Sequence, residues 1–250
     1  MLKKFLFVDL DDTLFQSRRK CPEHDGLTPV AYLRDGSAHS FFTPAQRSLF
    51  AFFQREMTVI PATARNADAF SRVRLGFRDG GIIDFGGVIL DARGVPEAPW
   101  LERSAALAAR SRALLEAALA AAQMHADALG VKLRARLIED FGVPFYLSAK
   151  SAEDNEPALD ILEPILRAHC VERAYPVAIH RNGNNLAVLP DWLDKRHAVE
   201  HLIVQLRARH GEILTFGMGD SASDLGFMRA CDYALVPRAS QIAAAMEDAA

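Results

Sequence analysis

The sequence is poor in cysteine, has little net charge and lacks a long apolar run. Its three cysteines, Cys21, Cys170 and Cys231, are odd in number and widely spaced, which argues against a disulfide framework or a zinc cluster and favours a reducing compartment. A formal net charge of −3 over 250 residues gives no electrostatic sign of nucleic-acid binding. The apolar run near the N-terminus ends at Asp9, too early for a signal peptide, and no other stretch approaches membrane-spanning length. We therefore expect a cytoplasmic protein without a membrane or nucleic-acid partner.

The sequence has the composition of a typical globular protein and contains a predicted strand that ends in acidic residues. Half of the residues are apolar and 24% are charged, and the length suits one or two domains. Residues 5–8 are a short apolar run typical of a strand buried on both faces of a parallel sheet. Asp9, Asp11 and Asp12 follow directly. Such sheets bind ligands at the carboxyl ends of their strands, and neighbouring carboxylates favour a divalent cation. The alternative is a solvated acidic turn.

A polar and turn-rich excursion, residues 16–42, follows this strand. Asp35-Gly36 lies between two short strand-like segments and predicts a hairpin turn. A loop of this length either overhangs a ligand site or is a surface feature without such a role. Thr43-Pro44 then predicts the start of a helix, with threonine as the cap and proline in the first turn.

A second candidate segment follows the apolar residues 58–60. The Thr63 hydroxyl, the backbone N–H groups after it and the Arg65 guanidinium are all able to donate hydrogen bonds to a phosphate group. Threonine and asparagine also cap helices for purely structural reasons, so this segment alone does not decide between the two interpretations.

Residues 81–190 have the pattern of a separate domain inserted between two halves of the first one, residues 1–80 and 191–250. Two short strands flank Gly86-Gly87, and one long helix or two in series cover residues 101–129. The order strand, strand, helix, strand, strand follows. It predicts an antiparallel sheet with helices on one face and the other face open, which suits a lid or an oligomerisation surface.

The first pattern returns after the insertion. Lys195 lies in the first turn of a predicted helix, where a cation opposes the helix dipole and raises the question of which anion it serves. The buried strand 213–218 leads to Asp220 and Asp224, and a helix starting nearby would turn both carboxylates the same way. Strand ends therefore carry two acidic pairs, a hydroxyl and an ammonium. This set predicts a hard cation and a phosphoryl group in one crevice, with a carboxylate able to act as nucleophile.

In this order the motifs resemble those of the haloacid dehalogenase-like phosphohydrolases along the whole chain. The matching segments are Asp9-Leu10-Asp11-Asp12-Thr13, Thr63-Ala64-Arg65, Lys195 at a helix start, and Gly219-Asp220 with Asp224. The resemblance implies Asp9 as the nucleophile and Asp11 as the general acid and base. It implies that Thr63 and Lys195 bind the phosphoryl group, beside the donor expected at Arg65. It also implies Mg²⁺ held by Asp9, the Asp11 backbone carbonyl and Asp220, with Asp224 as a further ligand or as a support for the others.

The inserted segment resembles the cap of sucrose-phosphate, trehalose-phosphate and mannosylphosphoglycerate phosphatases and of one class of phosphomannomutase. This implies an α/β fold, a Rossmann-like parallel core with an αββαββ cap. It also implies a phosphatase acting on a small phosphorylated metabolite, with a sugar phosphate expected; we expect a monomer or homodimer. Ala64 and Ser223 replace a Gly and an Asn that are usual in relatives. The alternatives are a sugar phosphomutase and a metabolite-binding protein without turnover. Candidate specificity residues lie on or beside the open sheet: His180, Arg181 and Arg134, with Arg136, Lys150 and Asn182 as further ones.

Overall fold

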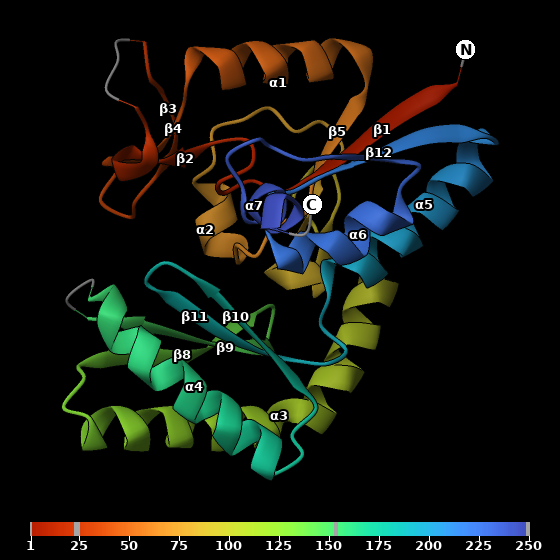
Figure 1. Cartoon of the computed structure of the whole chain (residues 1–250). Helices are drawn as coiled ribbons and strands as arrows, with labels where there is room; N and C mark the ends of the chain where they lie inside the picture. The colour runs from red at the N-terminus through yellow and green to blue at the C-terminus, as the bar shows by residue number, and fades with distance from the viewer. Residues whose placement is uncertain (1, 23–25, 153–154, 249–250) are drawn as a thin grey trace. The chain divides into compact units, whose positions relative to one another are not determined.

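The computed structural model describes residues 2–22, 26–152 and 155–248, and the chain forms two compact units. The core unit comprises Met1–Leu101 and Asp194–Ala250, and the inserted unit comprises Glu102–Leu193. Figure 1 follows the chain through both units by colour. Among the described residues, no helix combines the length and the apolar character needed to cross a bilayer.

The core unit is built on a parallel sheet with the strand order β13-β12-β1-β5 (Figure 1). Its strands are β1 (Lys3–Val8), β5 (Thr58–Pro61), β12 (Ile213–Met218) and β13 (Tyr233–Leu235). Phe5 and Phe7 of β1 belong to one apolar cluster, and Leu6 and Val8 belong to a second one. Because successive side chains of a strand point to opposite faces, β1 is buried on both sides, as its unbroken apolar sequence predicts.

Helices cover both faces of this sheet. They are α1 (Pro44–Glu56), α2 (Ala67–Ser71), α5 (Lys195–His210), α6 (Leu225–Ala230) and α7 (Gln241–Asp248). Phe50 and Phe53 of α1 pack in the cluster of Leu6, whereas α5 and α6 contribute to the cluster of Phe5. The predicted start of α1 is confirmed, since Gln46 N donates to Thr43 Oγ1 at 3.2 Å and Thr43 N donates to Gln46 Oε1 at 2.9 Å.

The excursion after β1 folds into a small antiparallel sheet of β2 (Gln16–Ser17), β4 (Ala38–Phe42) and β3 (Thr28–Tyr32), in that order. The predicted hairpin turn is present, with Leu33 N donating to Ser37 O at 2.9 Å. Val30 and Phe42 are buried in the same cluster as Phe50. The described part of the excursion is therefore packed onto the core unit through these apolar side chains.

The first boundary between the units lies at residue 102, later than the predicted position at residue 81. The hairpin of β6 (Gly81–Ile83) and β7 (Val88–Leu90) belongs to the core unit. Thr63 N donates to Ile82 O at 2.9 Å, and Ile82 and Ile89 pack in the cluster of Phe7. The hairpin thus continues the core beyond β5. The second boundary, after Leu193, lies close to the predicted one after residue 190.

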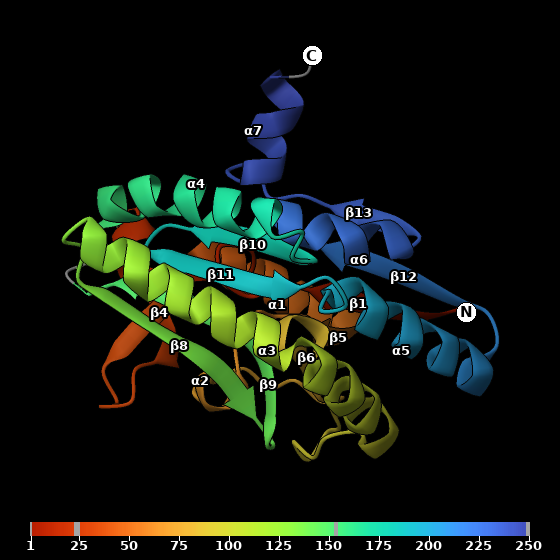
Figure 2. The same cartoon turned by 90° about the horizontal axis from the view of Figure 1, so that it is seen from below.

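The inserted unit has the predicted order αββαββ. Its elements are α3 (Ala98–Ala128, whose first residues belong to the core unit), β8 (Leu133–Asp140), β9 (Val143–Ser151), α4 (Glu156–Glu172), β10 (Val177–Asn182) and β11 (Asn185–Pro190). The strands form an antiparallel sheet in the order β10-β11-β9-β8, with α3 and α4 on one face (Figure 2). Ala122 of α3 and Leu166 of α4 pack there against Leu147 and Val188. The long helix is single, and Gly130 follows it with a left-handed φ of 66°.

Candidate active site

Backbone hydrogen bonds at the carboxyl edge of the core sheet bring three predicted segments together. Asp9 N donates to Met218 O, at the end of β12, at 2.9 Å. Ala62 N donates to Val8 O at 2.8 Å. Asp9 therefore lies between the segment that continues to Asp220 and the segment that continues to Thr63. This is the edge at which parallel α/β sheets bind their ligands.

A buried ammonium joins two of the predicted carboxylates. Lys195 Nζ donates to Asp9 Oδ1 at 2.6 Å and to Asp224 Oδ1 at 2.7 Å, and all three residues are buried. Asp194 caps α5 through its side chain, which accepts from Arg196 N at 2.7 Å and so fixes where the helix begins. Lys195 thus stands in the first turn, as predicted, and the anions that hold it there are Asp9 and Asp224.

Asp224 is also tied to the turn after β12. Its Oδ2 accepts from Asp220 N at 3.2 Å, from Ser221 N at 3.1 Å and from Ser221 Oγ at 2.9 Å. A Cβ atom on Gly219 would lie 2.3 Å from Asp224 Cβ. Only glycine allows this approach, which explains why a Gly-Asp pair precedes Asp224. Ser223 Oγ lies 2.8 Å from Ser221 Oγ, so the residue that departs from the family pattern takes part in the same turn.

Thr13 is a supporting residue that the sequence interpretation did not assign to the site. Its Oγ1 donates to Asp220 Oδ1 at 2.8 Å, and both side chains are buried. The hydrogen bond fixes the orientation of a carboxylate from a strand end far along the chain. The signal for it was present, because Thr13 closes the Asp-x-Asp-x-Thr motif.

The carboxylates form a group that suits a hard cation. Oxygen atoms of Asp9, Asp220 and Asp224 lie within 4.8 Å of one another. When all are ionised, three carboxylates face one ammonium, so two negative charges remain without compensation. Burial raises the pKa of Asp9 well above its usual value, although Lys195 opposes the shift. Burial likewise raises the pKa of Asp220 to about 6. Oxygen donors with an excess of negative charge fit Mg²⁺.

Asp220→Asn should stabilise the metal-free protein above pH 6. The variant keeps an Oδ1 acceptor for Thr13 but removes a charge that burial disfavours. The pKa of Asp220 rises from 3.8 to about 6 on folding, so ionisation costs the wild type stability as pH rises through this window. The full cost, about 3 kcal/mol at most, is present above pH 6 and absent below pH 4.

Thermal unfolding at pH 4 and pH 7.5, in chelator and in Mg²⁺, measures this effect. We expect the variant to unfold at a higher temperature than wild type in chelator at pH 7.5 and at a similar temperature at pH 4. Added Mg²⁺ should stabilise wild type more than the variant, because a ligand that binds only the folded state stabilises it. A variant that is less stable than wild type at pH 7.5 without metal would contradict the charge argument.

A strained turn connects Thr63 to Lys195. Asp84, Phe85 and Gly86 have φ values of 51°, 53° and 98°, and Phe85 N donates to Thr63 O at 3.2 Å. A Cβ on Gly86 would lie 2.6 Å from Asp194 O and 3.0 Å from Lys195 Cα. The turn therefore abuts the start of α5, and left-handed residues of this kind concentrate at functional sites. In the sequence it is visible only as a glycine break between two strands.

Arg65 pairs with the Asp11 carboxylate in the structure. Its Nε donates to Asp11 Oδ2 and its Nη2 donates to Asp11 Oδ1, both at 2.7 Å. The Asp11 carboxylate is thus paired with a guanidinium and does not belong to the metal-type group of carboxylates. Thr63 is buried beside Arg65, with its Oγ1 accepting from Arg65 N at 3.1 Å.

The three predicted specificity residues lie in the inserted unit, on two different faces of its sheet. Arg181 Nη2 donates to Glu156 O at 3.0 Å and lies 3.1 Å from Asp160 Oδ1, so Arg181 is on the face covered by α4. His180 precedes it on β10 and therefore points to the opposite face. The sheet register pairs His180 with Ala187, Ala187 with Ser148 and Ser148 with Arg136, so Arg136 shares the face of His180. Arg134 lies two residues before Arg136 on β8 and is on the same face.

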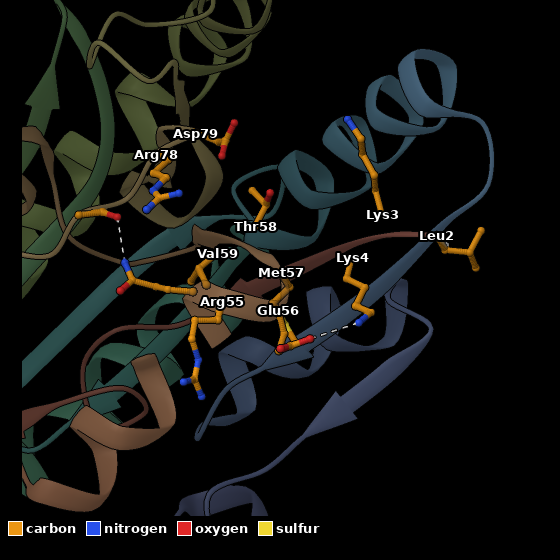
Figure 3. A pocket seen from close by; sticks show the side chains of 12 residues that line it. Leu2, Lys3, Lys4, Arg55, Glu56, Met57, Thr58, Val59, Arg78 and Asp79 are labelled. Carbon is orange, nitrogen blue, oxygen red and sulfur yellow. Dashed lines mark hydrogen bonds and ion pairs between the residues drawn. The ribbon is translucent and has the colours of Figure 1, made fainter. Parts of the chain in front are cut away.

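A cavity of about 490 Å³ lies at the other edge of the core sheet, where β1 and β5 begin (Figure 3). Lys3, Lys4 and Arg55 give it a basic lining, but Lys4 is paired with Glu56 at 3.6 Å. Asp9 follows the far end of β1, which is about 20 Å away at 3.3 Å per residue. This cavity is therefore separate from the candidate site.

Solved structures with the same fold were found, whereas no protein-family model and no curated protein matches the chain. Sucrose-phosphatase from Synechocystis sp. PCC6803, in complex with sucrose and phosphate, is 17% identical with a TM-score of 0.55 and aligns over 99% of this chain and 97% of its own. The C-terminal domain of trehalose-6-phosphate phosphatase from C. albicans is 11% identical with a TM-score of 0.58, over 92% of this chain and 73% of its own. A protein of Thermoplasma acidophilum is 13% identical with a TM-score of 0.52, over 99% and 98% of the two chains. At these identities the likeness confirms the predicted fold, a parallel α/β core with an inserted α/β unit.

Proposed function

We propose that this chain is a Mg²⁺-dependent phosphatase that hydrolyses a small phosphorylated metabolite through an aspartyl-phosphate intermediate. The observation that carries the proposal is the buried group at the carboxyl edge of the core sheet. In it Lys195 bridges Asp9 and Asp224, and Asp220 completes a set of oxygen donors within 4.8 Å. The order of the motifs and the fold shared with sugar-phosphate phosphatases support it.

In the first step of the proposed reaction, a carboxylate oxygen of Asp9 attacks the phosphorus atom. The bond from phosphorus to the leaving oxygen breaks as Asp11 donates a proton to that oxygen. Lys195 holds the Asp9 carboxylate and offsets the charge on the transferring group, together with the Thr63 hydroxyl. In the second step Asp11 takes a proton from water, which attacks phosphorus, releases phosphate and regenerates the Asp9 carboxylate.

The acidic group would hold the metal through Asp9, Asp220 and the backbone carbonyl of Asp11, with Asp224 as a ligand or support. Asp224 already engages Lys195 and the turn after Gly219, which suits a supporting role. A bound Mg²⁺ neutralises negative charge on the phosphoryl group and orients it. Thr13, by fixing Asp220, would keep the oxygen donors in place.

The proposed substrate class is a sugar phosphate or a related phosphorylated polyol. The open face of the inserted unit's sheet offers cationic and hydrogen-bonding side chains, among them Arg134, Arg136 and His180, and such groups recognise hydroxyl-rich or anionic molecules. Two of the structures with the same fold are phosphatases of sucrose phosphate and trehalose 6-phosphate by name. Arg181, which faces α4, is left out of this set.

The test is a panel of sugar phosphates, nucleotides, phosphoglycerate derivatives and a generic aryl phosphate, each with Mg²⁺ and with chelator. We expect phosphate release that depends on Mg²⁺ and is fastest for a sugar phosphate. When the reaction is quenched with acid during turnover, the peptide that contains Asp9 should carry the additional mass of one phosphoryl group. Isomer formation without phosphate release would favour a mutase, and inactivity towards every compound would reject the proposal.

A further inference from the structure

The pairing of Arg65 with Asp11 is the most specific contact in the site that the proposed reaction leaves without a role. Both oxygens of the carboxylate accept, one from Nε and one from Nη2, at 2.7 Å each. This fork-to-fork geometry fixes the plane of the carboxyl group as well as its position. The Asp11 side chain is 43% exposed, so burial does not hold it in place and the guanidinium does.

Arg65 is itself held along its whole length. Its side chain is only 13% exposed, its Nη1 donates to Ala69 O at 3.2 Å, and its Cζ lies 5.3 Å from the centre of the Phe15 ring. Its backbone N donates to Thr63 Oγ1 at 3.1 Å, and its carbonyl accepts from Asp84 N at 2.9 Å. Nε and Nη2 thus donate to Asp11, and Nη1 and the backbone N donate to other protein atoms. Turning the guanidinium towards a ligand would break several of these contacts.

The loop that carries Asp11 is shaped to meet this guanidinium. Phe15 is fully buried, and Asp12 N donates to Phe15 O at 2.7 Å, which closes the loop between Leu10 and Phe15. Phe15 therefore supports both Asp11 and Arg65. Its backbone closes the loop that carries Asp11, and its ring packs against the Arg65 guanidinium. Loop, ring and guanidinium together leave the Asp11 side chain one favoured orientation.

We infer that Arg65 is a positioning residue for Asp11 and not a ligand of the transferring phosphoryl group. This inference rests on the proposed function, in which Asp11 carries the proton. While one carboxyl oxygen gives its proton to the leaving oxygen and the bond from phosphorus to that oxygen breaks, the other oxygen stays on Arg65. Proton transfer depends steeply on such geometry, and a positioned acid contributes about 10² to 10⁴ in rate.

If Arg65 positions Asp11, its removal should slow the reaction most for substrates whose leaving oxygen needs a proton. If Arg65 binds the phosphoryl group, its removal should slow the reaction equally for all leaving groups. An alkyl phosphate needs a proton on its leaving oxygen, whereas 2,4-dinitrophenyl phosphate, which releases an acidic phenol, does not. For Arg65→Gln we expect kcat/KM to fall by about 10² with a sugar or alkyl phosphate and by less than about threefold with the dinitrophenyl ester. The inhibition constant of inorganic phosphate should stay unchanged. Arg65→Lys keeps the charge but loses the fork, and should resemble Arg65→Gln.

Two further comparisons complete the experiment. In an Asp11→Asn background, Arg65→Gln should cause no further loss, because a residue that acts through Asp11 has nothing left to position. Arg34→Gln is the matched control, since Arg34 makes an exposed pair with Asp68 through its Nε and Nη2, at 3.0 and 2.8 Å, and neither residue has a role in the proposed reaction. This variant should have the same kcat/KM as wild type with both esters.

The outcomes separate the inference from the proposed function. Equal losses with both esters, together with weaker inhibition by phosphate, would identify Arg65 as a phosphate ligand and overturn the inference alone. A further loss in the Asp11→Asn background would overturn it as well. Wild type that hydrolyses neither ester would overturn the proposed function and the inference that rests on it. Thermal unfolding of each variant shows whether the protein is folded in every comparison.

Discussion

Asp9→Asn should reduce phosphate release by a factor of about 10⁴ or more, the scale seen when a covalent nucleophile is removed. The amide nitrogen and oxygen cannot take the phosphoryl group, so the first step has no acceptor. The amide oxygen can still accept from Lys195, which donates to Asp9 Oδ1 at 2.6 Å in the wild type. The measurement is kcat with p-nitrophenyl phosphate and Mg²⁺.

The loss should occur in a folded protein. Burial raises the pKa of Asp9, so the ionised carboxylate is a cost to stability that the asparagine does not carry. In chelator at pH 7.5 the variant should unfold at a temperature no lower than wild type. Asp12→Asn is the matched control from the same loop: Asp12 pairs with Lys20 at 2.6 Å, and its left-handed φ of 65° suits asparagine. It should keep most of the activity. Equal kcat for Asp9→Asn and wild type would rule out the mechanism.

Lys195→Met should have the largest effect on stability, about 3–5 kcal/mol at pH 7.5, because it leaves Asp9 and Asp224 buried without their shared cation. Burial alone would lower the pKa of Lys195, but the charges of Asp224 and Asp9 outweigh it, and the pKa is raised. The stabilisation from Lys195 is therefore fully present below its unfolded pKa of 10.5 and is lost only as pH rises beyond it. Thermal and denaturant unfolding in chelator measure the difference.

Two comparisons test this charge argument. Adding Asp9→Asn to Lys195→Met removes one of the two stranded carboxylates and should recover part of the stability, but none of the activity. Lys20→Met makes the same substitution at a pair in which the lysine side chain is 41% exposed. It should cost less than about 1 kcal/mol, as exposed ion pairs contribute little. Similar losses for Lys195→Met and Lys20→Met would show that burial does not govern the effect.

The features that the sequence predicts well are those with local signals. The unbroken apolar run of β1, the cap at Thr43 and the turn at Asp35-Gly36 are read from a few neighbouring residues, and all three are present. The carboxyl edge of the sheet is also predictable. Parallel strands end at the same edge of a sheet, so two predicted strands that end in Asp9 and near Asp220 place both carboxylates at that edge.

The features that the sequence does not predict depend on contacts between distant segments. Arg65 could donate to a phosphate as well as to Asp11, and the choice is set by how Phe15 closes its loop beneath the guanidinium. The β6 hairpin resembles the start of a new domain in sequence, but its packing against Phe7 assigns it to the core unit. The sequence does predict that His180 and Arg181 point to opposite faces, because neighbouring residues of a strand alternate.

The strand order of the core sheet also has a consequence for the nascent chain. β1 pairs with β5 on one side and with β12 on the other, and Ile213 follows Pro61 by 152 residues. At ribosomal rates of about 5–20 residues per second, roughly eight to thirty seconds separate the two partners. During that time the whole inserted unit is made while one edge of β1 lacks its neighbour. An unpaired strand edge favours aggregation, so β1 depends on protection until β12 emerges from the ribosome.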